Sequence, residues 1–209
     1  MQRAALVTLL AALVLGGFEP LKGVDTLIRA ISILKDKGLM TQKPYSLSII
    51  GGDPEPSPLE MNAEMARLKL LCHNLGLDDM VVFLGKRSQD SLVYYYSAAE
   101  AVIMPSHYES FGMVALEAMA CGTPVVASQV GGLAFLVQDE VTGYVVPDGD
   151  PEILADRLTR LIIQPNLSQR LGERAAACAQ EYAWPKITER IMDVYKNVLE
   201  SSLKIEPVK

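Results

Sequence analysis

Two glutamates, Glu109 and Glu117, stand eight positions apart on either side of a glycine-containing turn. A carboxylate only accepts hydrogen bonds, and it therefore suits the hydroxyl groups of a sugar. Between them, Gly112 precedes a predicted helix, whose first turn would offer unpaired N–H groups and the positive end of the helix dipole to a phosphate. An anion site flanked by carboxylates indicates a nucleotide-sugar. From the spacing alone, the simpler interpretation is that Glu109 is solvated and that Glu117 only caps or solubilises a helix.

The elements around these glutamates are predicted to hold them at one edge of a sheet. Residues 101–104 form an apolar run that predicts a buried strand, and Pro105 and Ser106 end it. The helix ends at Gly122, and residues 125–127 predict the next strand. In an open parallel sheet, the turn after a strand lies at the carboxyl edge, where ligands bind.

Several motifs in this order resemble a known family. The segment HYESFGMVALEAMACGTPVV (107–126), preceded by MPS (104–106) and followed by TGYVVPDGD (142–150), resembles the E-x7-E region of retaining GT-B glycosyltransferases, in particular glycosyltransferase family 4 (glycosyl transferases group 1). The resemblance spans residues 12–200. It implies that Glu109 contacts the donor sugar and that Glu117 binds the ribose. It also implies that the sugar and diphosphate are held by Ser110, Phe111, Gly112, Met113 and Val114.

A second segment, GGFEPLKG (16–23), is predicted to approach the donor phosphates. Lys22 would place a point charge beside the diphosphate, although it could equally be a solvated loop lysine. The resembling family pairs an Arg directly after the glycine with a Lys five residues later. Lys22 and Gly16 match this pattern, whereas Gly17 stands where the Arg usually is. That departure removes one cation and calls into question the strength of donor binding and the activity.

Lys86 and Arg87 directly follow a predicted strand at 80–84. The resemblance implies that this position contacts the uracil ring, and an Arg plane can stack on a base. The alternative is a solvated turn. The next helix carries three consecutive tyrosines, Tyr94 to Tyr96. Because successive helix positions point in different directions, packing explains them better than an aromatic binding surface does.

The fold class predicted is α/β, a single Rossmann-like doubly wound parallel sheet that resembles the C-terminal half of a GT-B fold. About six strands alternate with helices, and they are expected at 12–15, 45–50, 80–84, 101–104, 125–127 and 144–146. Glycine pairs follow three of these strands and favour one ligand cleft along the sheet edge. We assign 1–11 to an N-terminal extension, 12–200 to the nucleotide-sugar-binding domain and 201–209 to a tail. The apolar run 4–15 could instead mimic a signal peptide.

Composition excludes several classes of function. The 209 residues carry a net charge of −6 and no basic tract, which argues against nucleic-acid binding. The three cysteines are scattered without a CxxC pair, so a disulfide framework or a zinc site is not expected and a cytoplasmic setting fits better. No D-x-D-type pair stands beside the site, so we expect no metal and no cofactor other than the donor itself.

The resemblance implies transfer of a hexose, by family preference from UDP, to an unidentified acceptor hydroxyl with retention. The sequence accounts for one Rossmann-like domain only, and GT-B enzymes have two. We therefore expect the isolated chain to be weakly active or inactive and to need an N-terminal acceptor domain or a second chain. The complete enzyme could associate peripherally with a membrane. A non-catalytic nucleotide-sugar binding module and a nucleotide-sugar epimerase-like relative are the alternatives.

Overall fold

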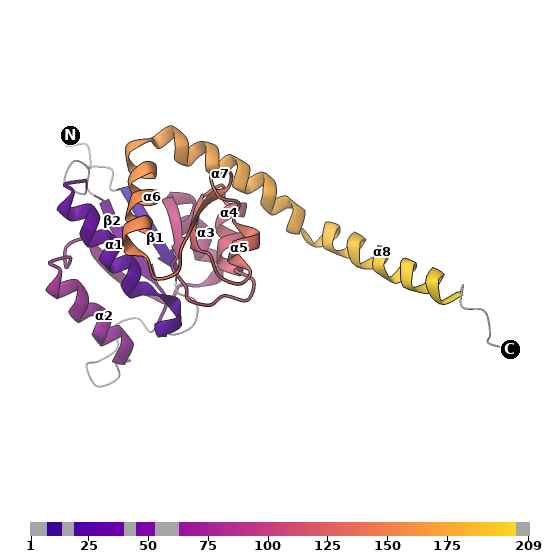
Figure 1. The fold of residues 1–209 in the computed structure, drawn as a ribbon, viewed down its shortest axis with the longest axis horizontal. Helices are drawn as coiled ribbons and strands as arrows, with labels where there is room; N and C mark the ends of the chain where they lie inside the picture. The colour runs from indigo at the N-terminus through magenta and orange to yellow at the C-terminus, as the bar shows by residue number, and fades with distance from the viewer. Residues whose placement is uncertain (1–7, 14–18, 40–44, 53–62, 204–209) are drawn as a thin grey trace.

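The computed structural model describes residues 8–13, 19–39, 45–52 and 63–203. Within them, one six-stranded parallel sheet runs in the order β3-β2-β1-β4-β5-β6 (Figure 1). This confirms the predicted doubly wound sheet. The chain adds strands on one side of β1 and then, from β4, on the other side. The carboxyl ends of β1 and β4 thus form the switch point at which such sheets bind ligands. The strands are β1 (Thr8–Leu13), β2 (Tyr45–Ile50), β3 (Val81–Gly85), β4 (Ala99–Met104), β5 (Val125–Ser128) and β6 (Gly143–Val146).

Helices cover both faces of the sheet. Packed on one face are α1 (Val24–Asp36), α2 (Ala63–Asn74) and α6 (Pro151–Ile163); on the other are α3 (Gln89–Ala98), α4 (Met113–Ala120) and the short α5 (Leu133–Leu136). The strand β4 shows the reason, because Ala101 and Ile103 enter one core cluster while Val102 and Met104 enter the other. A strand buried on both faces is apolar throughout, as the run at 101–104 predicted.

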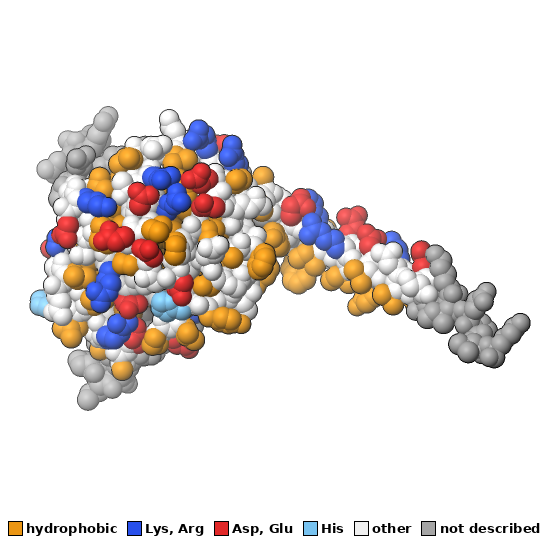
Figure 2. Space-filling model, viewed as in Figure 1, with side chains coloured by type: hydrophobic (Ala, Val, Ile, Leu, Met, Phe, Trp, Pro, Cys, Tyr) orange, Lys and Arg blue, Asp and Glu red, His pale blue; other side chains and the backbone are white. Residues whose placement is uncertain are grey.

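Two helices complete the chain. The helix α7 (Pro165–Ala179) contacts both α6 and α4 and so passes from one layer to the other. A one-turn helix, η2 (Gln180–Tyr182), leads into α8 (Trp184–Leu203), which extends away from the body (Figure 1). Figure 2 shows apolar side chains gathered along one edge of this protruding helix and charged ones along the other. The exposed apolar residues include Ile191, Val194 and Val198.

The predicted start of the first strand is wrong. The strand begins at Thr8, four residues before the expected start, and pairs with β2 from Thr8 opposite Tyr45 to Leu13 opposite Ile50. Residues 8–11, which the sequence assigned to an extension, therefore belong to the sheet. Apart from Thr8 the run 4–15 is apolar, so a change in hydrophobicity does not mark where the strand begins. The start of the strand is instead set by its pairing with the six residues of β2. At the other end, α8 continues to Leu203, into the predicted tail. Among the described residues, no helix has the length and apolarity needed to cross a membrane.

Candidate functional site

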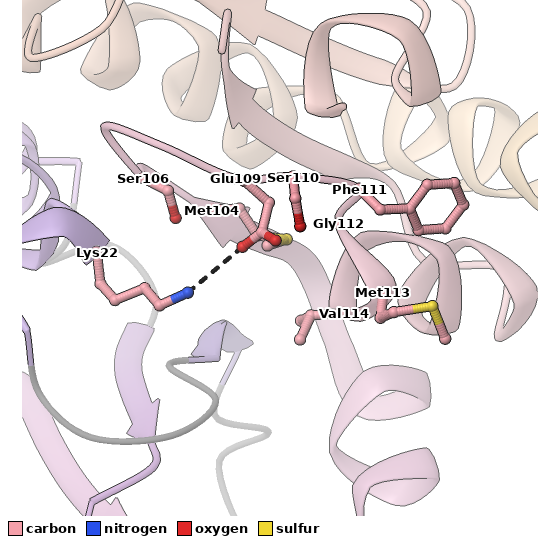
Figure 3. Close-up of a pocket in the computed structure, with 9 residues that line it drawn as sticks. All are labelled: Lys22, Met104, Ser106, Glu109, Ser110, Phe111, Gly112, Met113 and Val114. Atoms are coloured by element: carbon pink, nitrogen blue, oxygen red, sulfur yellow. Dashed lines mark hydrogen bonds and ion pairs between the residues drawn. The ribbon is translucent and has the colours of Figure 1, made fainter. Parts of the chain in front are cut away.

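A cavity of about 160 Å³ opens at the carboxyl end of β4. It is bounded by the one-turn helix η1 (Pro20–Lys22), by the end of β4, by the loop that follows and by the first turn of α4 (Figure 3). Its nine lining residues include seven that the sequence singled out: Lys22, Glu109, Ser110, Phe111, Gly112, Met113 and Val114. Met104 and Ser106 also line it. Their place just before Glu109, at the end of a buried strand, was the one sequence signal that could have found them.

Lys22 and Glu109 face each other across this cavity. The Lys22 Nζ lies 3.4 Å from the Glu109 Oε2, although the two residues are 87 positions apart (Figure 3). Their side chains are 25% and 18% exposed, so both are largely buried but still accessible to solvent. The ammonium is thus held at the mouth of the site by a partner that a phosphate could replace.

The N-terminus of α4 forms the opposite wall. Gly112 is its N-cap residue, with φ of 93°, and no side chain caps the helix there. The first N–H groups of a helix have no partner within it, so they are available to an anion. The side chains of Phe111 and Met113 point away from Lys22 (Figure 3), and Phe111 packs edge-on against Tyr182. The backbone of Phe111 and Met113, rather than their side chains, therefore faces the cavity.

The segment that carries Lys22 contacts the loop after β4 through a backbone hydrogen bond and close backbone packing. The His107 N–H donates to the Leu21 carbonyl at 2.9 Å. Gly23 follows with φ of 61°, and a Cβ there would lie 1.9 Å from the Pro105 carbonyl oxygen. Only glycine permits this approach. The close contact explains how residues so distant in sequence meet.

Two further contacts hold the other side of the same loop. The Gly132 N–H donates to the Glu109 carbonyl at 3.0 Å, and a Cβ on Gly131 would lie 2.0 Å from that oxygen. The His107 Nδ1 lies 2.6 Å from the Asp148 Oδ1. The glycine pair at 131–132, which the sequence linked to a ligand cleft, thus packs against the protein's own loop and positions Glu109.

Glu117 lies outside the cavity lining, in the second turn of α4. Its Oε2 accepts a hydrogen bond of 2.6 Å from the hydroxyl of Tyr96 on α3. Tyr96 is 2% exposed. Burial, and then the hydrogen bond to Glu117, raise the pKa of Tyr96, so the phenol keeps its proton and is the donor in this pair.

Lys86 and Arg87 are not brought to the cavity. They follow β3, three strands from β4, which at about 4.8 Å per strand is roughly 14 Å away. The Arg87 Nε donates to the Tyr95 hydroxyl at 3.0 Å, and an Nη donates to the Lys86 carbonyl. The guanidinium is held against the side chain of Tyr95 on α3. Gly16 and Gly17, predicted to contact the diphosphate, lie outside the described residues.

The described ranges contain no group of three or more His, Cys, Asp or Glu side chains that could hold a metal ion. The N-cap residue of α6 is Asp150, whose side chain accepts from the N–H groups of Glu152 and Ile153. Asp148 instead pairs with His107.

Residues 8–177 match the family described as glycosyl transferases group 1. The chain belongs to this family. A D-inositol 3-phosphate glycosyltransferase of Saccharomonospora viridis is 41% identical over 202 residues, which cover 94% of this chain and 46% of that protein. This chain thus spans less than half the length of that curated relative.

Two solved structures have the same fold as this chain. The sucrose-phosphate synthase of Thermosynechococcus elongatus is 35% identical, with a TM-score of 0.77 over 95% of this chain and 47% of its own. Anabaena HepE in complex with UDP-glucose is 25% identical, with a TM-score of 0.73 over 91% of this chain and 49% of its own. This chain corresponds to the C-terminal half of these GT-B glycosyltransferases.

Proposed function

We propose that this chain binds a UDP-hexose donor in the cavity between Lys22 and α4, as the donor half of a retaining glycosyltransferase that passes the hexose to an acceptor hydroxyl. The observation that carries the proposal is the convergence of a lysine ammonium, an uncapped helix N-terminus and a carboxylate on one cavity at the switch point. The similarity to a protein that holds UDP-glucose supports the choice of donor.

Each group has a distinct role in the proposed reaction. When the bond between the sugar and the diphosphate breaks, negative charge grows on the diphosphate. Lys22 and the N–H groups of Gly112 to Val114 stabilise that charge, an electrostatic contribution that needs no metal ion. Once the diphosphate engages Lys22, the carboxylate of Glu109 is released to accept hydrogen bonds from the sugar. Ser110 borders the same space.

The nucleoside would extend from the cavity across the sheet edge. Glu117 would accept hydrogen bonds from the ribose hydroxyls, and the base would lie toward Lys86 and Arg87. An extended nucleotide spans the roughly 14 Å between β4 and β3 estimated above from the strand spacing. The acceptor site belongs to a further half, on the same or a second chain, so we expect this chain alone to bind donor with little transfer.

A ligand-dependent thermal unfolding measurement tests the donor site. A ligand present at about 100 times its dissociation constant stabilises the folded state by roughly 2.7 kcal/mol. We expect this stabilisation with UDP and UDP-glucose, and less with GDP and ADP. Lys22→Met should lose it, whereas Lys196→Met, which removes a lysine on the exposed α8, should keep it.

Two results would contradict the proposal. One is a cooperatively unfolding wild-type chain that none of the four nucleotides stabilises. The other is equal stabilisation of wild type and Lys22→Met. Stabilisation without transfer, even after the N-terminal half of a relative is added, would instead favour the alternative of a non-catalytic binding module.

A further inference from the structure

The carboxylate of Glu117, the residue proposed to bind the ribose, already has a partner within the protein. It is partly buried between α4 and α3, and one of its oxygens is engaged by the Tyr96 hydroxyl at 2.6 Å. That length is typical of an O–H donor bonded to an ionised carboxylate, which is stronger than a bond between neutral groups. The carboxylate is therefore held in one orientation before any ligand arrives.

Tyr96 is itself fixed at both ends. Its ring belongs to the core cluster between α3, α4 and the sheet. Its carbonyl accepts a 2.6 Å hydrogen bond from the Thr123 hydroxyl, in the turn between α4 and β5. The tyrosine thus joins α3 to the second turn of α4 and to the turn that follows α4, and its hydroxyl has little freedom to leave Glu117.

The neighbouring tyrosine makes a parallel contact. The Tyr95 hydroxyl accepts from the Arg87 Nε, in the segment just before α3. Successive side chains of one helix therefore reach the two places at which the nucleoside is proposed to bind. The third member of the run, Tyr94, is 75% exposed and lies on the outer side of the helix.

We propose that Tyr96 is a positioning residue for ribose recognition: its hydroxyl holds the Glu117 carboxylate in the orientation that accepts hydrogen bonds from the two ribose hydroxyls. The proposal rests on the proposed function, and it assigns a role to a tyrosine that packing alone would not require to carry a hydroxyl. A free glutamate side chain would lose rotamer entropy on binding. A glutamate already held by Tyr96 loses less, and so binds more tightly.

The test compares two ligands that differ only in the ribose. Isothermal titration measures the dissociation constants of UDP and of 2′,3′-dideoxyuridine diphosphate for wild type, Tyr96→Phe and Tyr94→Phe. Wild type should prefer UDP. Tyr96→Phe should weaken UDP binding by about tenfold, the effect of one hydrogen bond to a charged group, and leave the dideoxy ligand unchanged. Tyr94→Phe should behave as wild type.

Several outcomes would overturn this role. If Tyr96→Phe weakens both ligands equally, or neither, the hydroxyl serves structure alone. If wild type binds both ligands alike, Glu117 does not contact the ribose. If wild type binds neither, the proposed function fails and this inference falls with it.

A second substitution, Glu117→Asp, tests the proposal even if the Tyr96→Phe variant does not fold. In Glu117→Asp, Tyr96 is intact, but the shorter carboxylate cannot reach both the tyrosine and the ribose. Loss of the preference for UDP over the dideoxy ligand is expected, and its retention would contradict the proposal. In Glu117→Ala, adding Tyr96→Phe should change the preference no further, because Tyr96 is argued to act through Glu117.

Discussion

At the scale of single residues, the pair of Lys22 and Glu109 decides what the cavity can bind. The carboxylate lies 3.4 Å from the only ammonium that lines the cavity among the described residues, so a diphosphate must compete with it. We expect Glu109→Gln to bind UDP several-fold more tightly, because the competing charge is gone. The same variant should lose the extra affinity that the hexose gives to UDP-glucose. Isothermal titration with both ligands measures the two effects.

Glu152→Gln is the matched control, since Glu152 is exposed at the start of α6 and away from the cavity. It should bind both ligands as wild type does. Weaker UDP binding by Glu109→Gln would show that the carboxylate helps to hold Lys22 in place rather than competing for it.

Gly131 offers a second prediction at this scale, because it separates steric contact from backbone strain. Its φ is +44°, and a Cβ would lie 2.0 Å from the Glu109 carbonyl oxygen. Gly149 has a similar φ of +67° with nothing within 4 Å. Gly149→Ala should cost only the left-handed strain, about 1–2 kcal/mol. Gly131→Ala should cost about 1–3 kcal/mol more, through overpacking.

Chemical denaturation measures both losses of stability, and UDP titration measures the consequence for the site. Gly131→Ala must displace the loop that carries Glu109, so nucleotide affinity should fall as well. Gly149→Ala should leave affinity intact. Equal destabilisation by the two alanines would mean that the Gly131 contact can relax without disturbing the loop.

At the scale of elements, the loop between β4 and α4 is the part on which the site depends. It is bonded to the Lys22 segment through the His107 N–H, to the β5–α5 turn through Gly132, and to the β6–α6 loop through the His107 side chain. His107→Ala removes the 2.6 Å contact with Asp148 while keeping the backbone bond. We expect this variant to lose more free energy of UDP binding than free energy of unfolding.

His73→Ala is the matched control for this prediction. His73 pairs with Asp78 at 3.1 Å at the end of α2, on an exposed surface and away from the cavity. It should change neither affinity nor stability measurably, as is typical of surface pairs. If both alanine variants bind UDP equally, the contact of His107 with Asp148 does not order the loop.

Much at this scale could be predicted from the sequence, because local patterns carry it. The strand, loop, helix and strand around Glu109 follow from an apolar run, Pro105, Gly112 and Gly122, and β4 to β6 match their predicted runs to within two residues. The contacts that complete the site could not be predicted in this way. The bond from His107 to Asp148 and the packing of Gly131 on Glu109 join residues far apart in the chain. A histidine or a glycine can pair with many kinds of residue, so the sequence does not tell which partner each one has. The cavity itself was predicted only by adding a family resemblance to the spacing of the glutamates.

At the scale of the whole molecule, burial of ionisable groups predicts how stability depends on pH. Burial raises the pKa of the Cys72 thiol from 9.0 to about 11. The folded state therefore holds this proton more tightly than the unfolded state. The stabilisation is complete below pH 9 and is lost as the pH rises toward 11. It amounts to at most about 2.7 kcal/mol, at 1.36 kcal/mol per pKa unit.

Urea denaturation between pH 8 and pH 11 measures this dependence. Wild type should lose stability more steeply over that range than Cys72→Ala, whereas Cys178→Ala should follow wild type. Because buried Tyr96 also has a raised pKa, part of the slope should remain in Cys72→Ala. Identical slopes in all three proteins would mean that Cys72 is not shielded from water.

The last helix, α8, can be removed to ask whether it contributes to the stability of the domain. From Trp184 to Glu200, every side chain of α8 is exposed except that of the partly buried Ile187. Burial of apolar area is the main source of stability, so α8 adds little of it. A chain that ends at Ala183 keeps Tyr182 against Phe111 and every residue that lines the cavity. We expect it to unfold at the same temperature as the full chain and to bind UDP equally well.

The shortened chain should also bind less of an apolar dye, because the exposed stripe of Ile191, Val194 and Val198 is gone. A marked fall in unfolding temperature would show that α8 packs on the body in solution, and unchanged dye binding would show that the stripe is covered.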